Sequence, residues 1–279
     1  MDVSLILCTK NGGDKLNKCL AAIEGLDAAV LDCHLVDNGS TDGVSYEALH
    51  RFAAASRFDV RVYQTFKRGN SAGRNVAIPH ASGQLVLFID DDCYPDPSFV
   101  ADWVQVFQEP GVGYASGTIA PFDRNYSYES CNEYPHDRYM APRQFVWRGF
   151  MTGSNMALSK ACLNSIGLFD ERLGAGTPFA AEDWDMSLRA SAKGWKGRYS
   201  PVPRVAHDHR RTEDEAAGRW RFYDYGAGAV YAKHTFTGRG IRIMREFLRE
   251  LARFAHDSVR RGDLLAGYFD FLRNRPRAR

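Results

Sequence analysis

Short apolar runs alternate with amphipathic stretches along the first hundred residues. The runs predict buried strands at residues 3–8, 29–37, 59–66 and 85–89. Between the first two runs, apolar residues return at helical spacing, and they are Leu16, Cys19, Leu20 and Ile23. Further helices are expected at 44–55 and within the glycine-rich segment 68–83. Strands that alternate with helices predict an α/β fold with a mostly parallel sheet, which binds ligands at the carboxyl ends of its strands.

The second half of the chain is less regular. It predicts a strand at 112–122, a loop or lid at 123–148 and a helix at 182–195. Asp96 is the expected N-cap of a further helix. The apolar residues on one face of that helix are Phe99, Trp103 and Phe107.

The composition is that of a soluble globular chain, with 44% hydrophobic and 25% charged residues. A net charge of +2 gives no reason to expect a nucleic-acid partner. Six scattered cysteines, several inside apolar runs, favour free thiols in a reducing compartment, and no apolar run reaches the ~20 residues of a membrane span. We expect a cytoplasmic protein with one domain over 1–212 and a helical, basic extension over 213–279 packed on it.

Three consecutive aspartates, Asp90, Asp91 and Asp92, come directly after a fully apolar strand. Like charges this close repel each other unless water or a cation compensates. Mg²⁺ and Mn²⁺ prefer carboxylate and phosphate oxygens. In extended geometry Asp90 and Asp92 would face the same side, with Asp91 turned away. The pattern therefore predicts a cation site, and its alternative is a solvated acidic turn.

Two common phosphate-binding signatures are missing. The chain has no G-x-x-x-x-G-K-[ST] loop, which argues against P-loop chemistry. The first strand is followed by "CTKNGGDKL" rather than G-x-G-x-x-G, which argues against a dehydrogenase. A cation held by carboxylates could neutralise phosphate charge instead.

The motifs, taken in order, resemble glycosyltransferase family two with the Rossmann-like GT-A fold. They include "HLVDNGSTDG", "LVLFIDDDCYPD", "MTGSN", "AEDWDMSLR" and "VAHDHRR", within a stretch from about residue 3 to residue 211. The resemblance implies an inverting enzyme that needs Mg²⁺ or Mn²⁺. It would move a sugar from a UDP-, GDP- or dTDP-sugar to an acceptor hydroxyl, in polysaccharide, glycolipid or natural-product glycoside synthesis.

The resemblance assigns the donor nucleotide to residues near the strand ends, namely Thr9, Asn11, Asp37, Arg74, Asp90 and Asp91. Asp37 would bind the base, and Arg74 would lie near the base or the diphosphate. Their residue types alone allow other roles, since Asp37 could cap the turn that follows it and Arg74 could be a surface residue.

The metal ligands implied by the resemblance are Asp92, Asp90 and His207. His209 is a second candidate, because residues two apart on a strand face one way. A lone histidine is more often structural, which is the alternative for both. A metal-dependent phosphoesterase could use the same four side chains, but it would leave Asp37 and the glycine-rich segment unexplained.

Glu182 and Asp183 match an acidic pair of the family, and Asp183 is the candidate general base with Glu182 beside it. Its alternative role is to complement the dipole of the helix that it begins. Trp184 and Gly153 are assigned to the acceptor, although Trp184 could instead pack in the core. A non-catalytic sugar-nucleotide-binding protein would tolerate the loss of these acids, and a nucleotidyltransferase would need a different first loop.

A basic amphipathic helix is predicted beyond residue 239. Its apolar stripe comprises Ile241, Met244, Phe247, Leu248, Leu251 and Phe254, and arginines are interleaved with it. We expect the stripe to pack on its own domain or on a second copy in a homodimer. The alternative is peripheral contact with an anionic membrane surface, at the inner face of the membrane.

Overall fold

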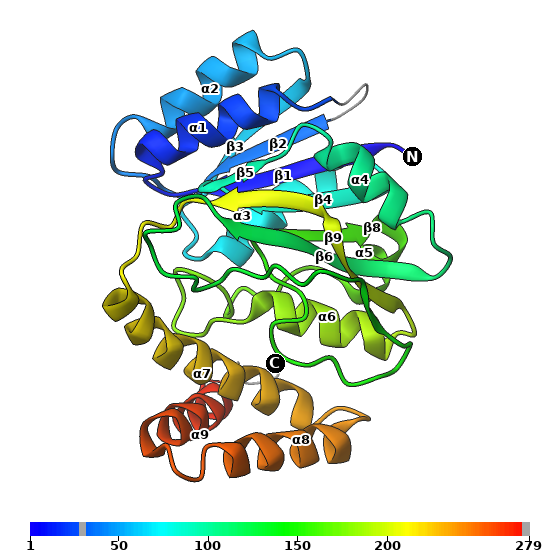
Figure 1. Ribbon diagram of the computed structural model, residues 1–279, viewed down its shortest axis with the longest axis vertical. Coiled ribbons are helices and arrows are strands. Elements are labelled where there is room, and N and C mark those ends of the chain that lie inside the picture. Colours follow the sequence, from blue (N-terminus) through cyan, green and yellow to red (C-terminus); the bar gives the residue numbers. More distant parts are fainter. Residues whose placement is uncertain (28–31, 275–279) are drawn as a thin grey trace.

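One nine-stranded sheet runs through the molecule, in the order β3-β2-β1-β4-β8-β6-β9-β5 with β7 on β9 (Figure 1). The computed structural model describes residues 1–27 and 32–274. The first four strands are β1 (Val3–Thr9), β2 (Asp32–Asp37), β3 (Asp59–Gln64) and β4 (Leu85–Asp90). They pair in parallel, so their carboxyl ends meet at one edge, where Thr9 lies beside Asp37 and Cys8 beside Asp90.

The remaining strands extend this sheet with both directions of pairing. They are β5 (Cys93–Pro95), β6 (Val112–Pro121), β7 (Arg138–Met140), β8 (Asn155–Ser159) and β9 (Lys196–His207). β8 is antiparallel to both β4 and β6, whereas β6 and β9 run parallel. β5 and β7 pair antiparallel with β9. The predicted fold class is confirmed, and β9 carries the chain back to the edge where the first strands end.

Helices cover both faces of the sheet. Those of the main body are α1 (Gly13–Glu24), α2 (Ser45–Ala55), α3 (Asn70–Ala77), α4 (Phe99–Val106), α5 (Lys160–Ile166) and α6 (Glu182–Ala192). Side chains of β1 alternate between two cores, because Leu5 and Leu7 face α1, α2 and α4 while Ile6 and Cys8 face the other side. The alternation explains why a strand covered on both faces is apolar throughout.

Three further helices follow the sheet, α7 (Glu213–Thr235), α8 (Gly240–Arg253) and α9 (Ser258–Arg273) (Figure 1). Buried Asp224 of α7 binds Arg148 at 2.6 Å and Arg260 of α9 at 2.6 Å, and Glu250 of α8 binds Arg148 at 3.0 Å. α7 and α9 cross in close contact, because Gly228 and Gly267 bring no side chain between the backbones. The division of the chain at residue 212 stays a prediction, and the packing of the extension on the main body agrees with it.

Two local predictions need correction, and a third falls partly outside the described residues. The helix after β5 begins at Phe99 with Ser98 at the N-cap, because the Asp96 N–H is held by the Arg204 carbonyl of β9. The predicted loop over 123–148 contains the short strand β7. Residues 29–31 of the predicted second strand lie outside the described residues.

The apolar stripe predicted on the C-terminal helix is only partly buried. α8 turns Ile243 and Phe247 into the core, whereas Ile241 is 91% exposed and Leu248 57% exposed. The contact with α7 and α9 therefore determines which face of α8 is buried, and it leaves part of the apolar stripe on the surface. No helix of the described chain combines the length and hydropathy that a membrane span requires.

The crossing of α7 and α9 makes a sharp prediction for stability. Gly267→Ala should lower Tm, because the new Cβ would collide with the Tyr225 carbonyl oxygen and force the helices apart, at a cost of about 1–3 kcal/mol. Gly262→Ala on the same helix is the matched control, since its Cβ would meet no atom within 4 Å, and it should leave Tm unchanged or raise it. Thermal unfolding of both variants checks this, and equal Tm values would contradict it.

Candidate active site

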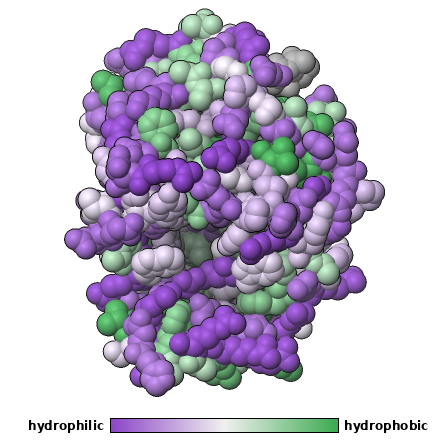
Figure 2. Space-filling view, in the orientation of Figure 1, coloured by the Kyte–Doolittle hydropathy of each residue, from purple (hydrophilic) through white to green (hydrophobic). Residues whose placement is uncertain are grey.

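Two adjoining cavities open at the edge where β1 and β4 end, and Figure 2 shows a hollow on this face between the sheet and the C-terminal helices. The aspartate cavity, of about 500 Å³, is lined by Thr9, Asp90, Asp91, Asp92 and His207 among others. The Asp183 cavity, of about 390 Å³, is lined by Gly153, Glu182, Asp183, Trp220 and Tyr223 among others. Their shared wall includes Asn70, Asp90, Ser130, Ser154, Arg219 and Tyr223.

A buried arginine lies behind this wall. Arg74 of α3 is 1% exposed, and it donates hydrogen bonds to Asp90 at 3.0 Å, to Glu182 at 2.9 Å and to the Gly153 carbonyl at 3.0 Å. Burial alone would lower the pKa of Arg74, but Asp90 and Glu182 outweigh it and raise this pKa. The guanidinium of Arg74 is therefore bound inside the protein, and its contact with the base or the diphosphate stays a prediction.

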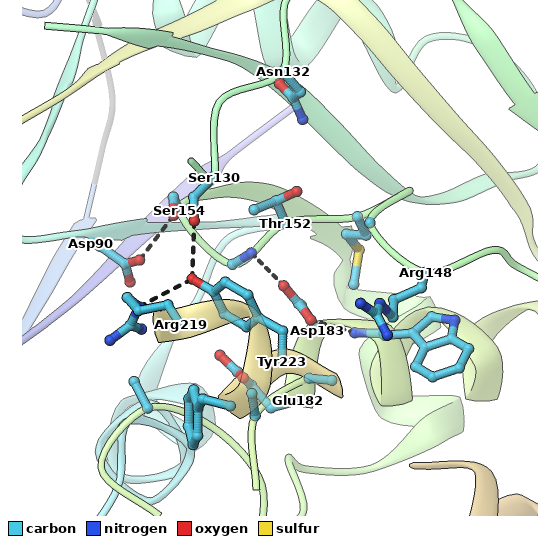
Figure 3. A pocket seen from close by; sticks show the side chains of 18 of the residues that line it. Asp90, Ser130, Asn132, Arg148, Thr152, Ser154, Glu182, Asp183, Arg219 and Tyr223 are labelled. Carbon is cyan, nitrogen blue, oxygen red and sulfur yellow. Dashed lines mark hydrogen bonds between the residues drawn. The ribbon is translucent and has the colours of Figure 1, made fainter. Parts of the chain in front are cut away.

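Asp183 points into the second cavity from the start of α6 (Figure 3). Its carboxylate accepts hydrogen bonds from the backbone N–H of Gly153 at 2.9 Å and from its neighbour's N–H at 2.6 Å. Ala181 takes a left-handed conformation, with φ of 77°, immediately before the helix. Burial and the charge of Glu182 raise the pKa of Asp183 to about 7. Asp183 thus carries a carboxyl group that both takes up and releases a proton near neutral pH.

The three aspartates point in different directions, since β4 ends at Asp90 and the chain turns through the next two residues. Asp90 accepts hydrogen bonds from Arg74 and, at 3.1 Å, from Ser154. Asp91 accepts from the Thr9 hydroxyl, and burial raises its pKa to about 7. Asp92 faces His207. The expectation that the first and third aspartates face one way along a strand is wrong, because the strand does not continue.

Asp92 and His207 form the centre of the cation candidate. His207 Nε2 lies 3.4 Å from Asp92 Oδ1. Within the described part of the chain, these two side chains and the Cys93 thiol form the group whose atoms lie close enough together to hold a metal ion. Burial would raise the pKa of Asp92, but His207 and Lys15 outweigh it and lower this pKa to about 2. Burial would likewise lower the pKa of His207, but Asp92 and Cys131 raise it to about 9.

The side chains of this group fit a hard divalent cation. A carboxylate and an imidazole are suitable ligands for Mn²⁺, and the buried Nδ1 of His207 has no hydrogen-bond partner among the described residues. Asp90 does not belong to this group, because it is bound to Arg74 instead. The Cys93 thiol is fully buried, and its pKa is raised by burial, which suits a core residue better than a ligand.

His209 does not share the position of His207, because β9 ends at His207. Its Nε2 is 2.8 Å from the Ser127 carbonyl, and its Nδ1 accepts the Arg211 N–H at 2.9 Å. Both ring nitrogens are therefore used within the protein. Of the two histidines, only His207 retains a nitrogen for a cation.

Besides Arg74, two further residues assigned to the nucleotide lie outside both cavity walls, Asp37 and Asn11. Asp37 is fully buried, and its carboxylate accepts from the Ser40 N–H at 3.2 Å and from Gln64 at 3.1 Å. Asn11 accepts the N–H groups of the same turn with its side-chain oxygen. The aspartate cavity is bounded here by Thr9 and the residue after Asp37. The structure thus shows turn capping for both, and their contact with a base stays a prediction.

Trp184 does not offer a flat surface to an acceptor. Its indole is 1% exposed, and its Nε1–H donates to the Val146 carbonyl at 2.8 Å. The ring also packs edge-on against Tyr231 of α7. The alternative of core packing is the one that the structure supports. Trp184 and Gly153 nevertheless both lie in the wall of the Asp183 cavity. A Cβ on Gly153 would come within 3.1 Å of Arg74.

Sequence reasoning missed the contribution of α7. Arg219, Trp220, Phe222 and Tyr223 line the Asp183 cavity, and Arg219 and Tyr223 also reach the aspartate cavity. The Tyr223 hydroxyl is 3.0 Å from Ser130, which joins the helix to the loop over residues 123–137 (Figure 3). Lys10, Arg68 and Arg211 are further cations of the aspartate cavity. The aromatic string "RWRFYDY" at 219–225 was the one available signal for the α7 residues.

Comparisons with known proteins place the chain in a family. It matches the family model "Glycosyl transferase family 2" over residues 4–167, more than half of its length. The chain therefore belongs to glycosyltransferase family 2. It is 23% identical over 247 residues to the pre-mycofactocin glycosyltransferase of Mycobacterium tuberculosis, covering 84% of this chain and 48% of that relative. The chain thus spans about half the length of this curated relative.

Solved structures share the fold at low sequence identity. The mannosyltransferase PcManGT from Pyrobaculum calidifontis, in complex with GDP-Man and Mn²⁺, is similar with a TM-score of 0.67 at 20% identity, covering 98% of this chain and 76% of that one. TarS 1–349 from S. aureus, in complex with UDP-GlcNAc, has a TM-score of 0.69 at 17% identity, covering 99% and 82%. The GT-A fold predicted from the motifs is confirmed.

The Arg74 network makes a prediction for stability. Arg74→Met should destabilise the protein by about 3–5 kcal/mol, because the buried Glu182 and the partly buried Asp90 would both lose their cation. Adding Glu182→Gln should restore part of the loss. Arg61→Met, which removes an exposed pair with Asp59, should cost at most about 1 kcal/mol. Urea unfolding checks these values, and a loss that Glu182→Gln does not reduce would contradict the role of the buried charge.

Proposed function

We propose that the protein is an inverting, metal-dependent glycosyltransferase that uses a nucleotide-diphosphate sugar. The observation that carries the proposal is the shared wall of the two cavities. A cation candidate with basic side chains lies on one side of it, and a carboxyl group with a pKa near 7 lies on the other. This arrangement suits a reaction between an anionic donor and a neutral hydroxyl.

The donor would occupy the aspartate cavity. Asp92 and His207 would hold Mg²⁺ or Mn²⁺, and Lys10 and Arg211 would face the diphosphate. The cation, when bound, neutralises negative charge on the departing nucleoside diphosphate. The ligands named for the solved relatives, GDP-Man with Mn²⁺ and UDP-GlcNAc, support a donor of this class. Ser154 and Asn70 hold the Asp90 carboxylate at the boundary between donor and acceptor.

The acceptor would occupy the Asp183 cavity. Asp183 takes the proton of the acceptor hydroxyl while the oxygen forms a bond to the anomeric carbon. The bond from that carbon to the diphosphate oxygen breaks, and its electron pair leaves with the nucleoside diphosphate. Displacement from the opposite face inverts the anomeric centre. The two backbone N–H groups that bind Asp183 hold its carboxylate toward the cavity.

An aromatic surface on α7 would contact the acceptor. Trp220 is 47% exposed, and with Phe222 and Tyr223 it lines the Asp183 cavity. Arg219 and Arg148, the basic side chains of this cavity, are paired with Glu129 and Asp224 respectively. A neutral acceptor, such as a sugar of a polysaccharide, a glycolipid or a natural-product glycoside, therefore fits this cavity better than an anionic one.

The general base makes a prediction for activity. Asp183→Asn should lower kcat by about 10²–10⁴-fold while nucleotide binding changes little, because the side chain touches the acceptor side only. In the wild type kcat/KM should rise with pH through about 7, since the raised pKa of Asp183 leaves the base protonated below that value. Steady-state kinetics across pH checks both, and a variant that keeps most of the activity would refute the assignment.

The cation candidate makes a separate prediction. Calorimetry with UDP, GDP and dTDP, each with and without Mn²⁺, should find one nucleotide whose binding needs the metal. Affinity for Mn²⁺ should increase from about pH 6.5 to 8.5, because the metal displaces the proton that the raised pKa of His207 retains. His207→Gln should abolish the metal dependence, and His209→Gln should preserve it.

The same measurements separate the other functions considered. Metal-dependent nucleotide binding without any transfer would favour a non-catalytic sugar-nucleotide-binding protein. Absence of nucleotide binding in a folded sample would reject the proposal. A phosphoesterase that uses both histidines is disfavoured, because the two ring nitrogens of His209 already bind Ser127 and Arg211.

A further inference from the structure

Basic side chains gather at one end of α8, far along the chain from the site motifs. We call this surface the basic corner, and it comprises Arg143, Lys193, Arg239, Arg242 and Arg245. Arg239 and Arg242 line two hollows, of about 890 and 550 Å³, which share residues 237–239 of the α7–α8 connection. Arg242 also donates to the Arg143 carbonyl at 3.2 Å, which fixes α8 against the loop after β7.

The basic corner lacks acidic partners. Within residues 1–27 and 32–274, no carboxylate lies within ion-pair distance of the first four members, and Arg245 has only its neighbour Glu246 at 3.9 Å. Other arginines of the C-terminal helices are paired, among them Arg221, Arg249, Arg260 and Arg273. Burial and the nearby charges of Arg242 and Arg143 lower the pKa of Arg239. The cations therefore repel one another, and an anion would relieve this repulsion.

Apolar side chains lie exposed beside these cations. Ile241, in the first turn of α8, is 91% exposed, and Leu248 lies two turns further along at 57%. Residues seven apart fall on the same face of a helix, so both belong to one surface of α8. Arg245 lies between these two residues, and Arg249 directly follows Leu248. A polyanion alone, such as a nucleic acid, would account for the arginines and leave the two apolar side chains in water.

We propose that the basic corner and the exposed face of α8 dock on an anionic phospholipid surface, with Arg239 and Arg242 at the headgroups and Ile241 in the interface. A helix with cations flanking an exposed apolar edge lies in the plane of such a surface. The docking is weak and reversible, since few apolar side chains enter the lipid, and it depends on salt because charge supplies most of the attraction. It is independent of the transfer reaction and holds whether or not the catalytic proposal is correct.

Co-sedimentation of the full chain with lipid vesicles tests the docking. Vesicles of phosphatidylcholine with phosphatidylglycerol should bind the protein at low ionic strength, and added salt should release it, whereas phosphatidylcholine alone should not bind. Arg239→Gln with Arg242→Gln should weaken binding about tenfold or more, given the attraction of each cation near the surface. The matched control is Arg51→Gln with Arg61→Gln on exposed α2 and β3, which should leave vesicle binding unchanged.

A second pair of variants separates apolar insertion from charge. Ile241→Asp should weaken vesicle binding, and Ile241→Leu should preserve it, while circular dichroism and Tm stay at the wild-type values because this side chain is exposed. Equal binding to neutral vesicles, or an equal loss in the Arg51 and Arg61 control, would overturn the proposal. The proposal would also be overturned if the protein bound inorganic phosphate or RNA through Arg239 but did not bind vesicles.

Discussion

The site depends on one buried charge. The guanidinium of Arg74 joins the end of β4, the loop at Gly153 and the start of α6, which are brought together from distant parts of the chain. Holding the partly buried Asp90 and the buried Glu182 near each other would be costly without a cation between them, because charges are poorly screened inside the protein. With Arg74 in place, the two carboxylates instead fix the common wall of the cavities. The same contact places the Gly153 N–H where it binds Asp183.

The part of the chain after residue 167, including α7 of the C-terminal extension, is needed to complete the candidate site. The family model ends at residue 167, whereas the acidic pair, His207 and the aromatic wall on α7 all lie beyond it. The aspartate cavity is thus built largely by the segment that the family model covers, and much of the Asp183 cavity by segments outside it. Asp224 of α7 forms ion pairs with Arg148 and Arg260. These pairs fix the position of α7, and therefore of its aromatic side chains in the cavity. Relatives with other helices in this position are then expected to accept other acceptors.

The sequence predicted the sheet and the edge that carries the site, because apolar runs and the residues that end them are local features. It could not predict side-chain contacts that depend on a partner from elsewhere in the chain. Arg74 was expected to reach a ligand, but Asp90 and Glu182 bind it inside the wall. Trp184 was assigned to the acceptor with core packing as the alternative, and its indole bonds to the Val146 carbonyl and packs against Tyr231. Which face of α8 is buried could likewise not be predicted from its own residues, since the contact of α8 with α7 and α9 decides which apolar side chains are buried.

Differences in protonation give the two cavities separate chemistry. Asp92 stays ionised at neutral pH, because His207 and Lys15 lower its pKa to about 2, and an ionised carboxylate is what a divalent cation requires. Asp183 has a pKa of about 7, because burial and Glu182 raise it while Arg74 opposes them. A cation site needs an ionised carboxylate, whereas a proton acceptor needs a carboxyl group with a raised pKa. Two such sites can adjoin only if the charges between them are balanced. The ion pairs of Arg74 with Asp90 and Glu182 provide that balance, so the network that shapes the wall also influences the proton affinity of Asp183, the proposed base.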